Sequence, residues 1–144
     1  MSVINIKIKR LNENAILPEK QHDSDAGYDL YSIEEIILKP NQIYKVKTGI
    51  AIQIPNNYGG LVLPRSGLSS KYGISLINTP GLIDPGYRGE LLIPLINHSS
   101  NEYTINKNER VAQLILIDIP EVKIEVTSDL DASDRDSKGF GSTG

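Results

Sequence analysis

One carboxylate and one phenol lie three residues apart in a segment rich in glycine and proline. Asp84 precedes Pro85, and Tyr87 follows soon after. Because a residue before proline is biased towards extended backbone, Pro85 restricts how the Asp84 carboxylate is aimed. The glycines of residues 78–91 leave room for a flat ligand against the backbone. This segment could recognise a planar ring through main-chain groups, although an ordinary β-turn uses the same residue types.

A second candidate site is the start of a short predicted helix at residues 66–72. Ser66 is a typical N-cap residue, and Gly73 is a typical C-terminal stop. The free backbone N–H groups of a helix start favour anions, and the adjacent Arg65 adds a planar fork suited to phosphate oxygens. A simple capped helical turn with a surface arginine is the competing interpretation.

The third candidate is the C-terminal segment, residues 134–144, which contains the only phenylalanine of the chain. Phe140 lies among glycines, where a ring that stacks on a base would be useful. Arg135, Ser142 and Thr143 could then donate to phosphate oxygens on either side of it. The composition favours a flap that closes over a nucleotide, with a mobile, functionless tail as the alternative.

The elements that must position these residues are expected to be strands. Apolar and polar residues alternate at residues 4–8, 50–54 and 122–126, which is the period of a half-buried strand. Many short strands separated by turn residues predict an all-β domain, a sandwich, jelly roll or barrel with one short helix. Further strands are expected at residues 36–38, 43–48, 61–63, 103–105 and 111–119, and on either side of the 78–91 segment at 74–77 and 91–96.

Composition excludes several classes of site. The 144 residues contain no cysteine, which rules out disulfides, thiolate nucleophiles and cysteine-ligated zinc. The formal net charge of −3 argues against a non-specific nucleic-acid binder. With no apolar run of membrane-spanning length and no signal-peptide pattern, we expect a cytoplasmic protein without a membrane partner.

Five segments in matching order resemble the trimeric deoxyuridine triphosphatases, or dUTPases, over nearly the whole chain. Any one segment is a weak signal, but all five at matching spacing are a specific one. The tail departs from the family in having Asp136-Ser137-Lys138 where glycines are common, but Arg135 and Phe140 keep their separation. The segments are residues 25–31, 64–74, 78–91, 109–115 and 135–144.

This resemblance implies a jelly-roll or distorted-barrel subunit that assembles as a homotrimer with sites shared between subunits. The jelly-roll domain would span residues 1–133, and residues 134–144 would form the flap. The implied reaction is hydrolysis of dUTP to dUMP and pyrophosphate with Mg²⁺, which keeps uracil out of DNA and supplies dUMP for dTMP synthesis.

The resemblance also assigns roles to residues. The 78–87 segment, including Gly81, Leu82, Ile83 and the Asn78 amide, would hold uracil, and Tyr87 would pack beneath the deoxyribose and exclude a 2′-hydroxyl. Asp84 would orient the attacking water and bond the 3′-hydroxyl. Asp29 would act on the metal through bound water. The phosphate chain would meet Arg65, Ser66, Gly67 and Gln113, and the flap would bring Arg135, Phe140, Gly141, Ser142 and Thr143.

Two competing functions remain. The related dCTP deaminases share an Ile-Asp-Pro-Gly-aromatic segment, but their catalytic glutamate falls where this chain has Pro94. They also lack the Gly-Phe-Gly-Ser-Thr-Gly ending found here. The other alternative is a β-sandwich binding module without turnover, which would have no use for Asp84, Gln113 and two arginines together. We interpret His22 and His98 as surface residues, and the tail aspartates as a solvated linker.

Overall fold

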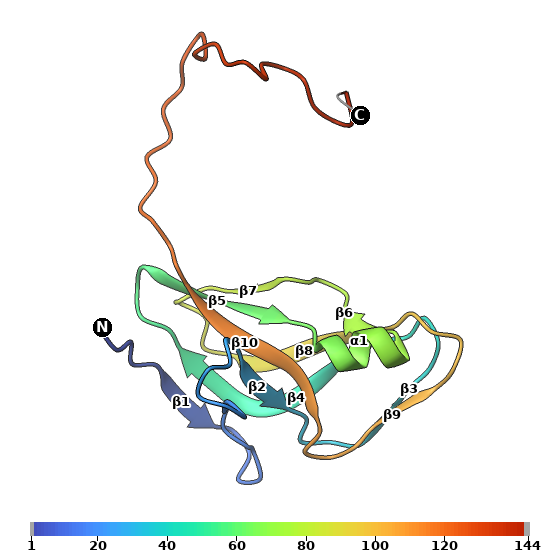
Figure 1. Cartoon of the computed structure of the whole chain (residues 1–144). Coiled ribbons are helices and arrows are strands. Elements are labelled where there is room, and N and C mark those ends of the chain that lie inside the picture. The colour runs from blue at the N-terminus through green and yellow to red at the C-terminus, as the bar shows by residue number, and fades with distance from the viewer. Residues whose placement is uncertain (1, 143–144) are drawn as a thin grey trace.

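The protein is an antiparallel β structure, described here by a computed structural model that covers residues 2–142. Within that range the chain forms ten strands and one helix (Figure 1). In chain order the elements are β1 (Lys7–Arg10), β2 (Tyr28–Tyr31), β3 (Ile36–Leu38), β4 (Ile43–Gln53), β5 (Tyr58–Leu63), α1 (Ser66–Tyr72), β6 (Ile74–Leu76), β7 (Gly81–Ile83), β8 (Glu90–Asn97), β9 (Tyr103–Ile105) and β10 (Arg110–Asp118).

Two four-stranded sheets enclose the core. Sheet A has the order β1-β4-β8-β6, sheet B has the order β2-β10-β5-β7, and β3 and β9 form a separate pair. Strands of both sheets contribute fully buried aliphatic residues to one cluster, including Leu30, Val46, Ile93 and Leu114. The ten strands and single short helix of residues 2–142 confirm the all-β prediction.

The two predicted strands at residues 43–48 and 50–54 merge into the single long strand β4. Its pairing with β8 shifts register between Lys47 and Ala51, around Gly49, whose φ is +71°. At this irregularity the Gly49 N–H donates to the Glu90 carboxylate at 3.0 Å, so a side chain supplies its hydrogen-bond partner. A residue other than glycine would be strained at this φ.

The 78–91 segment is more than the turn that its sequence predicts. Strands β6 and β8 pair directly, with Ile74 opposite Asn97. Between them the chain crosses to the other sheet, where β7 pairs with β5 through Gly60 and Ile83. The segment therefore bridges the two sheets, because its middle has strand pairing of its own.

The predicted helix is confirmed at Ser66–Tyr72, with one correction. Arg65 occupies the N-cap position and makes no side-chain capping bond, while Ser66 is already the first helical residue. Gly73 ends the helix in the left-handed conformation, with φ 69°, as its residue type predicts. Across residues 2–142, we find no helix with the length and hydropathy needed to span a membrane.

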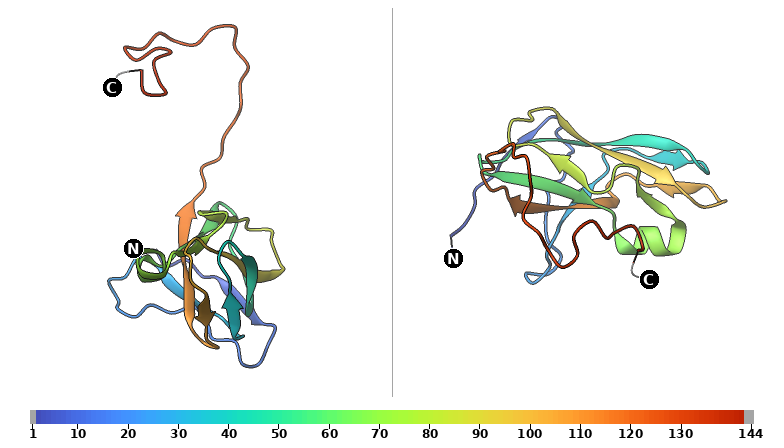
Figure 2. Two further views of the ribbon diagram at one scale, coloured as in Figure 1. Left: turned by 90° about the vertical axis from the view of Figure 1, so that its right-hand side faces the viewer. Right: turned by 90° about the horizontal axis from the view of Figure 1, so that it is seen from above.

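The strand predicted at residues 122–126 is wrong. Val122, Ile124 and Val126 are 72%, 88% and 95% exposed, and the segment leaves the body of the protein after β10 (Figures 1 and 2). Alternation alone does not make a strand, because the backbone also needs an edge to pair with. The first predicted strand is likewise shorter than expected, since β1 begins at Lys7 instead of Ile4.

Candidate functional site

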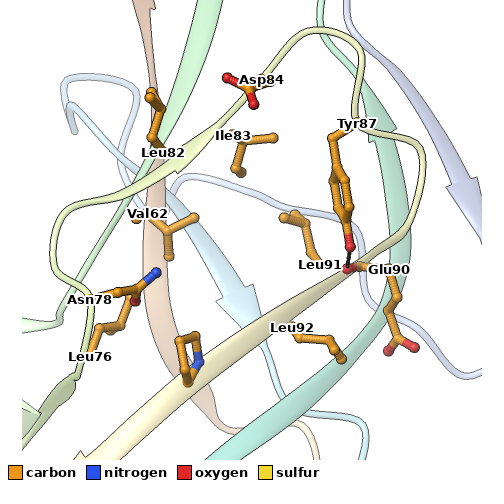
Figure 3. Close-up of a pocket in the computed structure, with 12 residues that line it drawn as sticks. Val62, Leu76, Asn78, Leu82, Ile83, Asp84, Tyr87, Glu90, Leu91 and Leu92 are labelled. Carbon is orange, nitrogen blue, oxygen red and sulfur yellow. Dashed lines mark hydrogen bonds between the residues drawn. The ribbon is translucent and has the colours of Figure 1, made fainter.

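The 78–91 segment and strand β8 enclose a cavity of about 210 Å³, which we call the hairpin cavity (Figure 3). Its walls include the aliphatic side chains of Val62 and Leu91. Asn78, Asp84 and Tyr87 add an amide, a carboxylate and a phenol. A small slot with apolar walls and few polar groups suits a flat ring that carries hydrogen-bonding edges.

Short-range hydrogen bonds fix the shape of the hairpin cavity. The Tyr87 N–H donates to the Asp84 carbonyl at 3.1 Å and closes the turn. The Arg88 guanidinium donates to the Pro85 carbonyl at 2.6 Å. The Tyr87 hydroxyl donates to the Glu90 carbonyl at 2.8 Å and holds the ring upright on one side of the cavity (Figure 3).

Two glycines make room for the polar side chains. A Cβ on Gly89 would lie 2.7 Å from Cζ and 3.0 Å from Cε1 of Tyr87, so the ring rests directly on the Gly89 backbone. A Cβ on Gly81 would lie 3.2 Å from the Asn78 amide nitrogen. At Gly81 and Gly89, the space predicted for a flat ligand is therefore taken by side chains of the protein itself.

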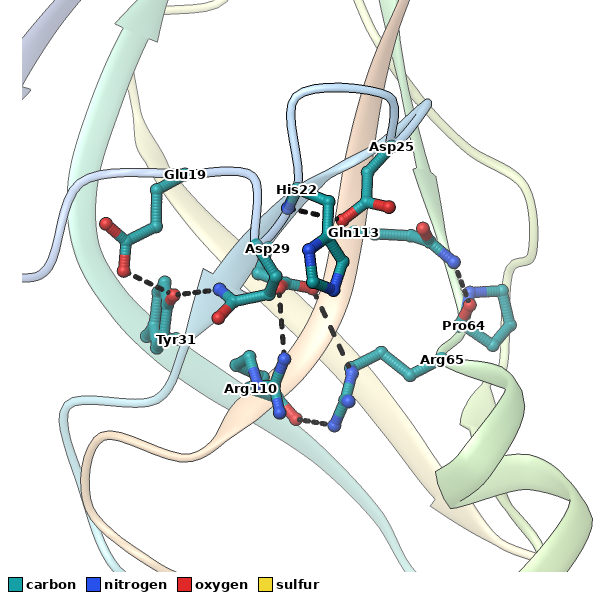
Figure 4. Close-up of polar contacts among 10 residues, drawn as sticks. Glu19, His22, Asp25, Asp29, Tyr31, Pro64, Arg65, Arg110 and Gln113 are labelled. Carbon is teal, nitrogen blue, oxygen red and sulfur yellow. Dashed lines mark hydrogen bonds and ion pairs between the residues drawn. The ribbon is translucent and has the colours of Figure 1, made fainter.

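A polar group on the outer face of sheet B forms the second candidate region, which we call the Asp29 cluster (Asp29, Arg65, Arg110 and Gln113; Figure 4). The Asp29 carboxylate lies 3.5 Å from Nη1 of Arg110 and 4.0 Å from Nε of Arg65. Arg65 Nη1 donates to the Arg110 carbonyl at 3.1 Å. Two guanidinium groups thus share one carboxylate, which leaves net positive charge for an anionic ligand.

Sheet register brings the cluster together from distant segments. In β10, Gln113 lies opposite Asp29 of β2 on one side and Leu63 of β5 on the other. The Gln113 amide donates to the Pro64 carbonyl at 2.9 Å and fixes the chain that leads into Arg65. Gln113 is therefore already engaged in positioning the segment that carries Arg65.

Two tyrosines flank the cluster. Burial, with the Glu19 carboxylate as a second cause, raises the pKa of Tyr31 to about 12. Burial and the charge of Glu109 raise the pKa of Tyr103 to about 12. Both phenols consequently keep their protons and donate, Tyr31 to Glu19 at 2.7 Å and Tyr103 to Glu109 at 3.3 Å. Burial also raises the pKa of Glu109 itself.

The structure groups some of the predicted site residues and separates others. Asn78, Gly81, Leu82, Ile83, Asp84 and Tyr87 line the hairpin cavity. A different cavity, of about 520 Å³, is lined by Arg65, Gly67 and Arg110. Ser66 is exposed at the start of α1. The two cavities have no lining residue in common among residues 2–142.

Over residues 134–142, the predicted flap contacts neither region (Figure 1). Phe140 is fully exposed, and Arg135 donates to the Lys138 carbonyl at 2.8 Å within the tail. Gly141 and Ser142 are exposed at the end of the described chain. Thr143, also predicted for the site, lies outside the described residues.

Arg110 is the member of the Asp29 cluster that the sequence interpretation did not select. It lies in the 109–115 segment used for the family resemblance, but only Gln113 of that segment was selected. Its contact with Asp29 depends on sheet register, which the sequence does not display.

The donor set restricts how a metal could be held. Among residues 2–142, no group of three or more histidine, aspartate or glutamate side chains is placed to bind an ion. His22 and His98 are exposed. The single carboxylate of the Asp29 cluster fits a Mg²⁺ ion that keeps its waters and takes most of its ligands from a phosphate chain.

Comparisons with known proteins agree on one family. The dUTPase family model matches residues 13–144. A deoxyuridine 5'-triphosphate nucleotidohydrolase of Clostridioides difficile is 48% identical over 140 residues, covering 97% of this chain and 98% of that protein. One from Clostridium acetobutylicum is 44% identical over 142 residues, covering 99% and 98%.

Solved structures of dUTPases are similar in fold. The Staphylococcus bacteriophage 80alpha dUTPase with dUpNHpp has a TM-score of 0.89 and 34% identity, covering 97% of this chain and 98% of that chain. A mutant dUTPase from phage phi11 of S. aureus, described with a structural Mg(II) ion, has a TM-score of 0.82 and 30% identity, covering 89% and 99%.

Proposed function

The chain belongs to the dUTPase family, and we infer that it is a dUTP diphosphatase that hydrolyses dUTP to dUMP and pyrophosphate. Its all-β fold with one short helix is that of the dUTPase jelly roll. The observation that carries the function is the hairpin cavity, where an amide, a carboxylate and a phenol converge on a slot of about 210 Å³.

We propose that the hairpin cavity binds deoxyuridine. Uracil would meet the Asn78 amide and the main chain of residues 81–83, while the aliphatic walls cover its faces. The Tyr87 ring, held between the Gly89 backbone and the Glu90 carbonyl, would lie beneath the deoxyribose. A ring fixed in that position leaves no space for a 2′-hydroxyl, so UTP would be rejected sterically.

The proposed chemistry is in-line attack of water on the α-phosphorus. Asp84 would accept a hydrogen bond from the water and orient it, since its carboxylate is exposed at the rim of the hairpin cavity (Figure 3). The new P–O bond forms as the bond to the pyrophosphate leaving group breaks. Such substitution depends mainly on positioning and charge neutralisation, which few side chains suffice to supply.

We propose that the Asp29 cluster receives the phosphate chain. The donors to phosphate oxygens would be the Arg65 guanidinium, the Ser66 hydroxyl, the backbone N–H groups of Ser66 and Gly67, and the Gln113 amide. Asp29 would hold a hydrated Mg²⁺ through water. When bound, the metal would neutralise charge on the phosphate oxygens.

The separation of the two cavities supports a homotrimer with shared sites. Over residues 2–142 of one chain, the hairpin cavity shares no lining residue with the cavity beside Arg65 and Arg110. Facing copies would combine the hairpin cavity of one subunit with the Asp29 cluster of another. The outer face of sheet B carries a partly exposed aliphatic row, including Leu61 and Leu82, that a neighbouring subunit would cover.

The tail supports the same arrangement. Residues 122–138, all exposed, extend away from the body after β10 (Figure 2), so we propose that Arg135 and Phe140 close over a site on another subunit. We propose residues 1–133 as the domain and residues 134–144 as the flap, in a cytoplasmic enzyme.

A dCTP deaminase function is disfavoured by strand β8. Pro94 lines the hairpin cavity at the position where we placed the deaminase glutamate. The Glu90 carboxylate, at the start of the same strand, accepts the Gly49 N–H. Neither residue supplies a free acid for deamination.

The test is pyrophosphate release from dUTP in the presence of Mg²⁺, with dCTP, dTTP and UTP measured in parallel. We expect release from dUTP alone. Ammonia from dCTP would instead identify a deaminase, and no product from any of the four would identify a binding module.

A further inference from the structure

Arg110 reaches the Asp29 cluster through an irregularity in strand β10. Gln113 lies opposite Asp29, but the next pairs are Ala112 with Leu30 and Arg110 with Tyr31, so Val111 is an extra residue. In a regular strand, residues three apart point to opposite faces of the sheet. The extra residue places Arg110 on the same face as Gln113, while Val111 stays buried in the core at 1% exposure.

This placement closes a ring of contacts around Asp29. The Arg110 side chain binds the Asp29 carboxylate at 3.5 Å, and the Arg110 carbonyl accepts from Arg65 Nη1 at 3.1 Å. Arg65 Nε lies 4.0 Å from the other Asp29 oxygen. Arg110 is therefore the residue that touches both neighbours, one through its side chain and one through its backbone (Figure 4).

The charges of the cluster indicate what the Arg110 guanidinium adds. The Asp29 side chain is only 15% exposed, so its charge is poorly screened by solvent. With Arg110 present, two cations share one anion, and the cluster keeps a net positive charge. Without the Arg110 guanidinium, Asp29 would pair with Arg65 alone. The Asp29 charge would then neutralise that of Arg65, and the Arg65 guanidinium would turn towards Asp29 and away from a ligand.

We propose that Arg110 is a positioning residue that holds Asp29 and Arg65 in the geometry that receives the triphosphate chain. It acts through these two residues. The inference rests on the proposed function, because it assumes that the Asp29 cluster is the phosphate end of the site.

Binding of two nucleotides by calorimetry, with Mg²⁺ present, separates this role from a general structural one. Arg110→Met should weaken dUpNHpp binding by about tenfold or more and leave dUMP binding unchanged, because the hairpin cavity is intact. Arg110→Lys should recover part of the loss, since it restores the charge but not the fork. Lys107→Met removes an exposed cation three residues away and should bind both nucleotides as the wild type does.

A double-mutant cycle tests whether Arg110 acts through Asp29. If it does, Asp29→Asn combined with Arg110→Met should weaken dUpNHpp binding no more than the stronger single change. Additive losses, an equal loss of dUMP affinity, or wild-type dUpNHpp affinity in Arg110→Met would each overturn the proposal. A wild-type protein that binds neither nucleotide would refute the proposed function instead.

Discussion

The hairpin cavity and the Asp29 cluster are built in opposite ways. Hydrogen bonds between residues one to three positions apart shape the cavity, as between Tyr87 and the Glu90 carbonyl. The cluster joins residues 36 to 81 positions apart, from the Arg65–Asp29 pair to the Arg110–Asp29 pair. The residues of a site made from one continuous segment can be recognised in the sequence. The residues of a site made by sheet register cannot, because they meet only when distant strands pair.

The largest effect should come from the acid at the rim of the hairpin cavity. Asp84→Asn replaces the carboxylate proposed to orient the attacking water with a neutral, non-basic amide, so kcat should fall by about 10²–10⁴-fold. Binding of dUpNHpp should be retained, because the local hydrogen bonds use the Asp84 backbone and not its side chain. Steady-state kinetics with calorimetry checks both, and substantial residual turnover would remove Asp84 from its role.

Gly89→Ala tests whether local packing sets sugar specificity. The new Cβ would displace the Tyr87 ring, so the preference for dUTP over UTP in kcat/KM should fall by up to about 100-fold. Gly86→Ala is the matched control, because a Cβ there meets nothing within 4 Å. Unchanged preference in Gly89→Ala would show that Tyr87 does not select the sugar.

Phe140→Ala tests the tail, which contacts neither region over residues 134–142. Loss of one stacked base should cost about 1–3 kcal/mol of transition-state stabilisation, measured as kcat/KM. Leu130→Ala, which truncates another exposed apolar side chain of the tail, should have no effect. Wild-type kcat/KM in the Phe140 variant would exclude the ring from the site.

The smallest predicted effect is on the pH dependence of the protein's folding stability, through Glu109 beside the Asp29 cluster. Burial raises the folded-state pKa of Glu109 above its ordinary 4.5, so the folded protein holds this proton more tightly than the unfolded chain. That contribution is complete below the unfolded pKa and is lost as pH rises through the folded pKa.

Glu109→Gln should therefore reduce the loss of folding stability between the unfolded and folded pKa values of Glu109. Urea midpoints measured from about pH 4 to about pH 7 should fall less in the variant than in the wild type. Parallel curves for the two proteins would contradict the assignment of the proton to Glu109.

The sequence predicted the fold well where strands pair with neighbours in the same chain. It failed at residues 122–126, because a strand needs a pairing partner and this segment pairs with none of the strands in residues 2–142. It also placed the cap of α1 at Ser66 when Arg65 occupies that position.

The same distinction, between local and distant contacts, separates the site residues that the sequence predicts from those that it does not. The residues of the hairpin cavity lie together as the 78–91 segment predicts. Arg110 escaped notice because a regular two-residue period puts it on the opposite face from Gln113, and only the extra residue Val111 reverses this. Roles for the tail residues stay predictions, since the Phe140 side chain is fully exposed.

The most direct test of the shared site is activity in mixed trimers. Asp84→Asn and Arg65→Ala chains, carrying different tags, would be co-expressed and purified through both tags. If one subunit's hairpin cavity works with another's Asp29 cluster, every mixed trimer holds one site with both regions intact, and activity should be about one third of wild type. Activity no higher than that of the two separate variants would contradict the account, because it would place both regions of each site in a single chain.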